Sequence, residues 1–303
     1  MNIVVLGAGA LGAYFGGRWQ EAGQEVQFLV RERRAAELKE NGLTIHSVQG
    51  DYELEKLNIV QSVDEIEKVD LVLLAVKGYH LTGTIPHLKE LVHKGAKVLP
   101  VLNGIEHIDI LKEELGEEAV IGGLCFIIAT LNEKGHVSHT SKQHDIVFGA
   151  LHPSQQELCE DLAGISETAN MISRHSDDIL KDLWKKYMFI SAFSGVTAAG
   201  NFPIGTVRNN PSTFQLASNV LLEMKQLANV YDIPLSDEHV DKATEQLNSF
   251  PDEATSSMHQ DRRKGLTLEV EHLHGGAIRL AQKADLKLPY IETLYALIKP
   301  YEN

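Results

Sequence analysis

The chain has 303 residues, of which 43% are hydrophobic, so it is long enough for two ordinary domain cores. Asp and Glu number 42 against 28 Lys and Arg, and the net charge of -14 disfavours nucleic acid and membrane surfaces as partners, because it repels phosphate. The two cysteines, Cys125 and Cys159, show no metal-ligand spacing, and no apolar run is long enough to span a bilayer, so we expect a soluble cytoplasmic protein without a metal.

The first part of the chain, to about residue 175, alternates short apolar runs with amphipathic helical stretches. Continuous apolar strands separated by helices are typical of a doubly wound parallel sheet that is covered on both faces. The predicted strands are residues 3–6, 26–30, 71–76, 98–102 and 119–121. A hairpin-like insertion at 44–57 and a β-rich stretch at 124–148 add to this sheet. The sequence therefore predicts an α/β domain over residues 1–175.

After residue 178 nearly the whole sequence has a helical period. Apolar residues recur on one face in two stretches, namely Phe214, Ala217, Leu221, Met224 and Ala228, and Leu266, Val270, Leu273, Ala277 and Leu280. Asn210-Pro211 and Pro234-Leu235-Ser236 look like helix starts, with a capping side chain and a proline where its missing N–H does no harm. We predict an all-helical second domain over residues 176–303, packed closely enough on the first to leave a cleft.

A glycine-rich turn directly follows the first strand. It reads Gly7-Ala8-Gly9-Ala10-Leu11-Gly12 and opens a helical stretch that leads into the second strand. In this context of strand, turn and helix the pattern predicts a dinucleotide-binding site. The first glycine permits the turn, the second lets the backbone approach a pyrophosphate, the third lets the helix pack on the sheet, and the helix N-terminus faces the phosphates. The alternative is a glycine turn of purely structural use.

The end of the second strand indicates which dinucleotide the site prefers. An NAD site normally places Asp or Glu about 20 residues after the glycines, to hold the ribose 2′-hydroxyl. This chain has Arg31 there, followed by Glu32-Arg33-Arg34. A guanidinium forms charge-assisted bonds with a 2′-phosphate, whereas a carboxylate repels it. We therefore expect NADPH, with Arg31 as the first contact and Arg33 or Arg34 as the second; the alternative is that these arginines form a solvated helix start.

Two polar residues close further strands of the predicted sheet. Lys77 follows the strand at 71–76, and Asn103 follows the strand at 98–102; each precedes a glycine. Ligands of open α/β sheets collect at the carboxyl ends of the strands, so both residues are candidates for ligand contact. Taken alone, Asn-Gly is more typical of a plain turn, and Lys77 is equally typical of a solvated loop.

A helix predicted from about residue 178 to 199 is apolar nearly all round, so much of it must be buried. Lys186 is embedded in it, and helical spacing leads from this lysine to Ile190, Ser194, Thr197 and Asn201, a polar seam that we expect to face the cleft. Burial disfavours a charged ammonium, which makes a buried lysine a better proton donor to an alkoxide. The helix pattern is equally compatible with Lys186 extending to solvent, as Lys185 is expected to do.

Five segments together make the chain recognisable: VVLGAGALGAYFGG, LLAVKGYH, VLNGIEH, LWKKYMFISAFSGVTAAGNFPIG and SSMHQDRRKGLTLEVEHLHGG. In these segments, and in their order, the sequence strongly resembles the ketopantoate reductase family (2-dehydropantoate 2-reductase) over nearly its whole length. The resemblance implies a Rossmann-type N-terminal domain, an all-helical C-terminal domain and NADPH-dependent reduction of ketopantoate to pantoate, a step toward pantothenate and coenzyme A.

The resemblance also implies the site residues. The family's catalytic lysine falls on Lys186, its substrate-binding glutamate on Glu269, and its substrate-binding serine on Ser257. Its lysine after the third strand falls on Lys77 and the asparagine of its NG turn on Asn103. We expect Lys186, helped by Asn103, to protonate the carbonyl oxygen of a small keto acid. Glu269 would accept a hydrogen bond from a substrate hydroxyl and Ser257 would donate one; taken alone, Ser257 could instead cap a helix and Glu269 could be solvated.

The sequence leaves several alternatives open. Some family members carry asparagines where this chain has Ile190, Ser194 and Ile204, so the substrate preference is open, as is the choice between main enzyme and paralogue. A related two-domain dehydrogenase of a 3-hydroxy acid or opine-type substrate is one alternative function, and a non-catalytic NADP sensor is another. Nothing in the sequence decides between a monomer and a homodimer. His272 and His274 are expected to be ordinary helix residues.

Overall fold

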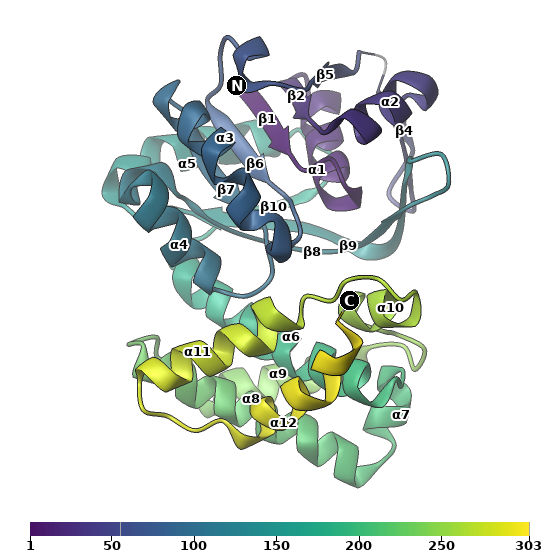
Figure 1. Cartoon of the computed structure of the whole chain (residues 1–303), viewed down its shortest axis with the longest axis vertical. Helices are drawn as coiled ribbons and strands as arrows, with labels where there is room; N and C mark the ends of the chain where they lie inside the picture. Colours follow the sequence, from purple (N-terminus) through teal and green to yellow (C-terminus); the bar gives the residue numbers. More distant parts are fainter. Residues whose placement is uncertain (55, 303) are drawn as a thin grey trace. The chain divides into compact units, whose positions relative to one another are not determined.

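The computed structural model describes residues 1–54 and 56–302, which divide into two compact units (Figure 1). The first unit comprises Met1–Leu102 and His107–Ile179, and the second comprises Asn103–Glu106 and Leu180–Asn303. The main crossing of the chain, between Ile179 and Leu180, therefore falls in the first turn of a long helix, slightly later than the boundary expected after residue 175. We call these the N-terminal unit and the helical unit.

A parallel sheet forms the centre of the N-terminal unit, as predicted. Its strand order is β5-β2-β1-β6-β7, so the first strand lies in the middle. The strands are β1 (Asn2–Leu6), β2 (Glu25–Leu29), β5 (Asn58–Val60), β6 (Leu71–Leu74) and β7 (Lys97–Pro100). All neighbouring strands pair in parallel, and the carboxyl ends of β2, β1 and β6 therefore lie side by side at one edge.

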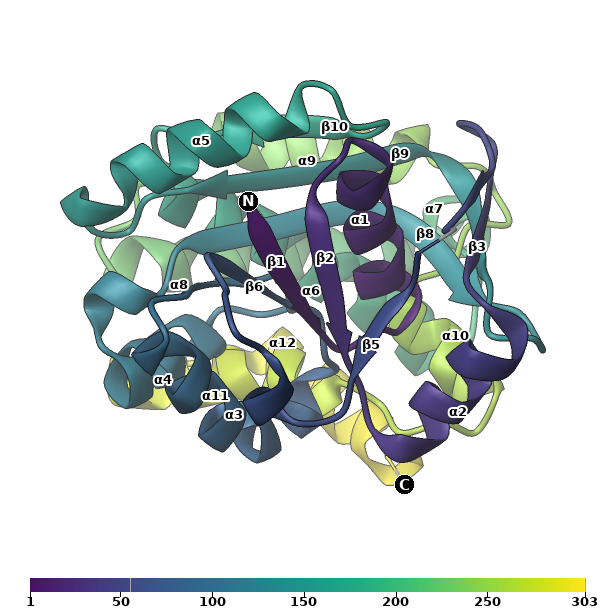
Figure 2. The same ribbon diagram turned by 90° about the horizontal axis from the view of Figure 1, so that it is seen from above.

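Helix α1 (Ala10–Glu21) is buried on all sides because it lies between two sheets (Figure 2). A Cβ atom added to Gly16 would meet Val5 and Phe28 of the parallel sheet at 2.6 and 3.1 Å, respectively. A Cβ atom added to the next residue, Gly17, would meet Ile45 of the second sheet at 2.7 Å. The two adjacent glycines thus let one helix approach both sheets closely, which places the N-terminus of α1 firmly at the end of β1.

The other face of the parallel sheet packs against α3 (Leu81–His93) and α4 (Glu106–Leu115), whose apolar side chains form a second core with those of the strands. Helix α2 (Glu32–Asn41) follows β2, and α5 (Gln156–Ser166) adds Cys159 and Leu162 to the core around α1. Short 3₁₀ turns join these elements at Val63–Glu65, Gly78–His80, Glu117–Ala119 and Pro153–Gln155. The parallel sheet is therefore covered on both faces, as its apolar strands predict.

A second sheet contains β10 (Ile172–His175), β9 (Val137–Gly149), β3 (Thr44–Ser47) and β4 (Tyr52–Glu53), with β8 (Gly122–Leu131) antiparallel to β9. The predicted hairpin is confirmed, since β3 and β4 pair antiparallel, but the hairpin and the β-rich stretch form this second sheet and do not extend the parallel one. The strand predicted at 119–121 is wrong. Residues Glu117–Ala119 form a 3₁₀ turn, and Val120 makes only one bridge to Val98 before the chain leaves for the second sheet.

The helical unit contains no strand within its described residues, in agreement with the helical period of the sequence. Its helices are α6 (Ile179–Gly200), α7 (Ile204–Arg208), α8 (Pro211–Val230), α9 (Asp237–Ser249), α10 (Ser257–Arg263), a π-helix (Glu271–Gly275), α11 (Gly276–Lys283), α12 (Pro289–Ile298) and a final 3₁₀ turn (Lys299–Tyr301). Asn210 caps α8 as predicted, and Ser236 is the N-cap of α9. Leu266 was expected on an apolar helix face, but it precedes the π-helix and is 50% exposed.

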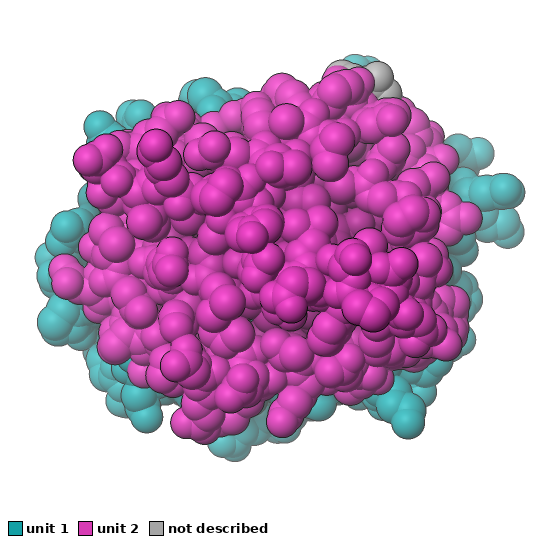
Figure 3. Space-filling model, turned by 90° about the horizontal axis from the view of Figure 1, so that it is seen from below, with its two compact units in different colours: residues 1–102, 107–179 teal, residues 103–106, 180–303 magenta. Residues whose placement is uncertain are grey.

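Helix α6 runs through the centre of the helical unit, and most of its side chains are buried. The Tyr187 hydroxyl donates to the Leu273 carbonyl at 2.5 Å, and the buried His274 ring binds the Ser191 carbonyl at 3.0 Å. These hydrogen bonds join α6 to the π-helix. Figure 3 shows one face of the helical unit, in magenta. No helix of the described residues has the length and apolar character needed to cross a membrane.

Candidate functional site

The glycine turn of the N-terminal unit has the geometry of a phosphate-binding turn. Gly7 has a φ of +104°, and a Cβ atom there would lie 2.9 Å from the Ala75 backbone, so only glycine fits. A Cβ atom at Gly12 would lie 2.2 Å from the Gly7 carbonyl oxygen, so the helix start packs directly on the turn. At Gly9 a Cβ atom would have no neighbour within 4 Å. The protein therefore leaves room at Gly9, where the family's pyrophosphate is expected.

The N-terminus of α1 supplies the positive end of this site. Gly9 is the N-cap residue and offers no side-chain cap, so the first N–H groups of α1 are left for another acceptor. Unsatisfied N–H groups and the helix dipole together favour an anion. The residues present therefore fit the phosphates of a dinucleotide.

The three arginines after β2 have different environments. Arg34 donates from Nε to the Ala8 carbonyl at 3.0 Å and from Nη2 to the Gly135 carbonyl at 2.9 Å, and it also pairs with Glu37. It thereby braces the glycine turn itself. Arg31 is the exposed N-cap residue of α2, and within residues 1–54 and 56–302 its guanidinium has no hydrogen bond or ion pair. Arg33 is exposed as well.

Arg31 approaches the residues that follow β6. Burial lowers the pKa of His80, and the positive charge of Arg31 lowers it further, so the two side chains lie near one another. Lys77 is the N-cap residue of the 3₁₀ turn Gly78–His80, directly beyond β6. Because β2 and β6 flank β1, the glycine turn, Arg31 and Lys77 share one edge of the sheet.

The helical unit holds the candidate catalytic lysine in a buried position. Lys186 on α6 is 8% exposed. Its neighbour Lys185 has a side chain that is 39% exposed and binds Asp182 at 3.1 Å. The two alternatives that the helix pattern left open are thus separated, since Lys185 reaches solvent and Lys186 does not. Ser194 and Thr197, on the same face, are also buried, whereas Asn201 lies beyond the end of the helix and binds His259.

Glu269 is buried and stands two residues before the π-helix. Its side chain is 5% exposed, and its carbonyl accepts the His272 and Leu273 N–H groups at 3.2 and 3.0 Å, respectively. Burial lowers the pKa of His272, and the Glu269 carboxylate opposes that shift, which places the carboxylate near the imidazole. A π-helix is rare and occurs often at functional sites. The alternative of a solvated Glu269 does not hold.

Ser257 is the first residue of α10, and it is exposed. It does not cap the helix: Ser256 does, by accepting the His259 N–H at 3.1 Å. The Ser256 hydroxyl also lies 3.0 Å from the Thr197 hydroxyl of α6, which ties the start of α10 to the helix that carries Lys186. The Ser257 hydroxyl has no hydrogen bond among the described residues and is thus left for a ligand.

Asn103 belongs to the helical unit rather than to the sheet that precedes it. Gly104 has a φ of +87°, and a Cβ atom there would lie 2.9 Å from the His272 carbonyl oxygen. The Asn103-Gly104 turn is therefore in direct contact with the π-helix that follows Glu269. The structure thus collects Asn103, Lys186, Ser257 and Glu269 in one unit, and the glycine turn, Arg31 and Lys77 in the other.

The model of the family described as "Ketopantoate reductase PanE/ApbA" matches residues 3–153, and the model of its C-terminal part matches residues 178–302. The chain belongs to the ketopantoate reductase family. It is therefore an oxidoreductase, and the expected Rossmann-type N-terminal unit with a helical C-terminal unit is confirmed.

Individual proteins similar to this one match it along its whole length. The sequence is 36% identical to an uncharacterized oxidoreductase, YkpB, of Bacillus subtilis (strain 168), with 100% of this chain and 99% of that protein covered. A solved structure of 2-dehydropantoate 2-reductase from Geobacter metallireducens GS-15 matches with a TM-score of 0.89 and 28% identity, over 99% of each chain. D-mandelate dehydrogenase, solved with NADH and anilino(oxo)acetate, has the same fold with a TM-score of 0.89 and 24% identity, over 99% of this chain and 98% of that one.

Ile190, Ser194 and Ile204, where the resemblance implies asparagines in some family members, have unequal environments. Ile190 is half-buried, one turn after Lys186, and Ser194 is 5% exposed, a further turn along α6. Ile204 has no exposed surface, so its side chain belongs to the core of the helical unit. Ile190 and Ser194 are therefore the positions that can affect a ligand beside Lys186.

Some contributors to the site could not be found from the sequence. Arg34 was one of two candidates for the second contact with a 2′-phosphate, after Arg31, but its bracing of the glycine turn depends on a carbonyl 26 residues away. Glu106 binds Arg279 across 173 residues, which no local pattern reveals.

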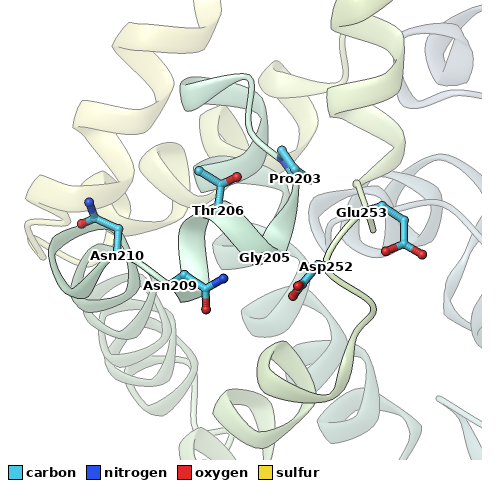
Figure 4. Close-up of a pocket in the computed structure, with 7 residues that line it drawn as sticks. All are labelled: Pro203, Gly205, Thr206, Asn209, Asn210, Asp252 and Glu253. Atoms are coloured by element: carbon cyan, nitrogen blue, oxygen red, sulfur yellow. The ribbon is translucent and has the colours of Figure 1, made fainter.

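The surface of the helical unit also has an open hollow, which is lined by Pro203, Gly205, Thr206, Asn209, Asn210, Asp252 and Glu253 (Figure 4). It contains none of the candidate residues.

Proposed function

We propose that this protein reduces 2-dehydropantoate (ketopantoate) to pantoate with NADPH, a step toward pantothenate and coenzyme A. The observation that carries the proposal is the burial of Lys186 in the same unit as Asn103, Ser257 and Glu269, the residues onto which the family's site falls. The likeness to a solved 2-dehydropantoate 2-reductase at 28% identity supports it.

The N-terminal unit would hold the cofactor. The N–H groups of α1 and the space at Gly9 suit the pyrophosphate, and the guanidinium of Arg31 suits a 2′-phosphate. NADPH, when bound, supplies the hydride for the carbonyl carbon. Lys77, at the same edge of the sheet, would contribute a second positive charge to cofactor binding.

Lys186 would act on the carbonyl oxygen of the keto acid. As hydride reaches the carbon, the carbonyl electron pair moves to the oxygen, and the Nζ ammonium stabilises that charge and gives the oxygen a proton. The Asn103 amide has no side-chain hydrogen bond within residues 1–54 and 56–302, so its N–H is left to donate to the same oxygen. Lysine then regains its proton from water.

Two further residues would recognise the substrate. Glu269 would accept a hydrogen bond from the hydroxyl group that ketopantoate has and plain 2-keto acids lack. The exposed Ser257 hydroxyl would donate to the substrate carboxylate. Loss of the Glu269 carboxylate should therefore reduce the discrimination between hydroxylated and plain keto acids.

The second candidate is a reductase of a keto acid with an apolar side chain. Ile190, one turn after Lys186, presents hydrocarbon where some family members present an asparagine amide. An apolar wall favours a methyl or aromatic group over a hydroxyl by about 1–3 kcal/mol.

The deciding experiment measures NADPH and NADH oxidation with ketopantoate, an unbranched 2-keto acid and an aromatic 2-keto acid. We expect the highest kcat/KM with ketopantoate and NADPH. A higher kcat/KM for the aromatic acid would favour the second candidate and contradict the first. Tight NADPH binding without oxidation of NADPH by any keto acid would contradict both and favour the NADP sensor.

A further inference from the structure

The segment Asn103–Glu106 is a short excursion of the chain. It follows β7 and opens α4, which both lie in the N-terminal unit, yet its own contacts assign it to the helical unit. Close packing of Gly104 on the His272 carbonyl is one reason. A second reason lies at Glu106, the last residue of the excursion.

Both carboxylate oxygens of Glu106 are bound by one guanidinium. Arg279 of α11 donates from Nε to Oε1 at 3.1 Å and to Oε2 at 3.2 Å, and from Nη2 to Oε2 at 2.6 Å. A forked arrangement of this kind fixes direction as well as distance, which a lysine in the same place would not do. The Glu106 side chain is 17% exposed, so the pair is shielded from water on the glutamate side.

The same guanidinium also holds the π-helix. Arg279 donates from Nη2 to the Glu271 carbonyl at 2.9 Å and pairs through Nη1 with the Glu271 carboxylate. Tyr295 and Lys299 bind the other oxygen of that carboxylate, each at 2.8 Å. Burial raises the pKa of Glu271, but these hydrogen bonds outweigh burial and lower the pKa to about 2, so the carboxylate stays charged. One arginine therefore joins the excursion to the element that begins two residues after Glu269.

We propose that Glu106 and Arg279 are positioning residues that hold the Asn103 amide at a fixed spacing from Glu269, because Arg279 binds both the turn, at Glu106, and the π-helix, at Glu271. Neither residue is among those proposed above to bind the substrate or act on its carbonyl group. The inference rests on the proposed function for its catalytic consequence, but the bonds of Arg279 to Glu106 and Glu271 lie entirely within the helical unit.

The first arm of the test is kinetic and uses the full-length enzyme. Arg279→Ala and Glu106→Gln should each lower kcat by on the order of tenfold, because small displacements of a catalytic amide are costly, while the Kd for NADPH changes less than about twofold. The double variant should be no worse than the poorer single variant, since both remove one interaction. Arg279→Lys, which keeps the charge but not the fork, should recover part of the lost kcat.

Arg208→Ala is the matched control. Arg208 also pairs with a carboxylate, Asp252, and donates to the Asn248 and Phe250 carbonyls at 2.8 and 2.9 Å within the same unit, but it has no bond to the turn. It should change the midpoint of thermal unfolding and leave kcat near the wild-type value. An Arg279→Ala enzyme with wild-type kcat, or a double variant with additive losses, would overturn the proposal.

The second arm does not depend on the reaction. Amide hydrogen exchange of the full-length protein should speed up at residues 104–106 in Arg279→Ala and not in Arg208→Ala. If the wild-type protein reduces no keto acid but this acceleration is seen, the proposed function is wrong while the restraint of residues 104–106 by Arg279 is confirmed. Unchanged exchange at residues 104–106 would remove the structural basis of the inference whatever the enzyme reduces.

Discussion

Replacement of Lys186 by methionine is the sharpest test of the proposed chemistry. The methionine side chain keeps most of the buried stem of the lysine, whereas alanine would remove about three methylene groups at about 0.8 kcal/mol each and confuse stability with activity. We expect Lys186→Met to lower kcat at least about a hundredfold. That loss corresponds to about 2.7 kcal/mol of barrier height, at about 1.36 kcal/mol for each factor of ten.

Lys185 provides a matched control one residue away. Its side chain is 39% exposed and pairs with Asp182 across a single turn, an interaction worth about 0.3–0.5 kcal/mol in stability. Lys185→Met should therefore keep kcat within about twofold of the wild-type value. The contrast between 8% exposure at Lys186 and the open position of Lys185 is the structural basis of this expectation.

The assay is steady-state NADPH oxidation with saturating keto acid, with NADPH affinity measured separately by fluorescence titration. A general acid contributes to the transition state and not to cofactor binding, so Kd should stay near the wild-type value. Equal effects of the two substitutions on kcat, or a Lys186→Met enzyme with unchanged kcat, would refute the role of Lys186.

Three further outcomes are expected. Arg31→Ala should raise the Kd of NADPH about tenfold and that of NADH far less, as titration of both would show, and equal losses would argue against a 2′-phosphate contact. Gly9→Ala should keep the unfolding midpoint and lose dinucleotide binding, because its Cβ meets only open space, whereas Gly7→Ala should lose stability; a Gly9→Ala protein that binds NADPH normally would contradict the site. Burial lowers the pKa of His274 from 6.5 to about 4, so as the pH falls the unfolded chain binds a proton at a higher pH than the folded protein does. The free energy of unfolding should therefore decrease by up to about 3 kcal/mol as the pH is lowered from about 6.5 to about 4. Urea unfolding at several pH values in this range should show that the free energy of unfolding depends less steeply on pH in His274→Asn than in the wild-type protein. An unchanged pH dependence would contradict the lowered pKa of His274.

Local features of the sequence predicted much of the fold. The glycine turn was predictable because the strand, the glycines and the helix start follow one another within one short stretch of sequence, although Ala75, which Gly7 contacts closely, lies far from that stretch. The cap at Asn210 was predictable for the same reason, since its side chain accepts hydrogen bonds from the N–H groups of Ser212 and Thr213, two and three residues later. The strand predicted at 119–121 was wrong because a short apolar run does not show which of two sheets the chain will join.

The burial of Lys186 and the bracing roles of Arg34 and Arg279 were beyond such reasoning. Helix periodicity left open whether Lys186 is buried or extends to solvent as Lys185 was expected to do, and only the packing of other helices decides this. Arg279 binds residues of two distant segments, and a single sequence carries no signal for such a pairing. The family resemblance supplied candidate residues, but not the contacts that hold them.

The excursion of residues 103–106 also governs how this chain can be divided. The polypeptide changes unit three times, after Leu102, after Glu106 and after Ile179, so no single cut separates the two halves cleanly. A fragment ending at Ile179 would keep Glu106 but lack its guanidinium, and a fragment beginning at Leu180 would keep Arg279 with its carboxylate partner from α4 missing. Independent expression of either half should therefore yield a protein with an unsupported turn or an unsupported arginine, and gene fusions that exchange the helical half between relatives need to carry residues 103–106 along with it.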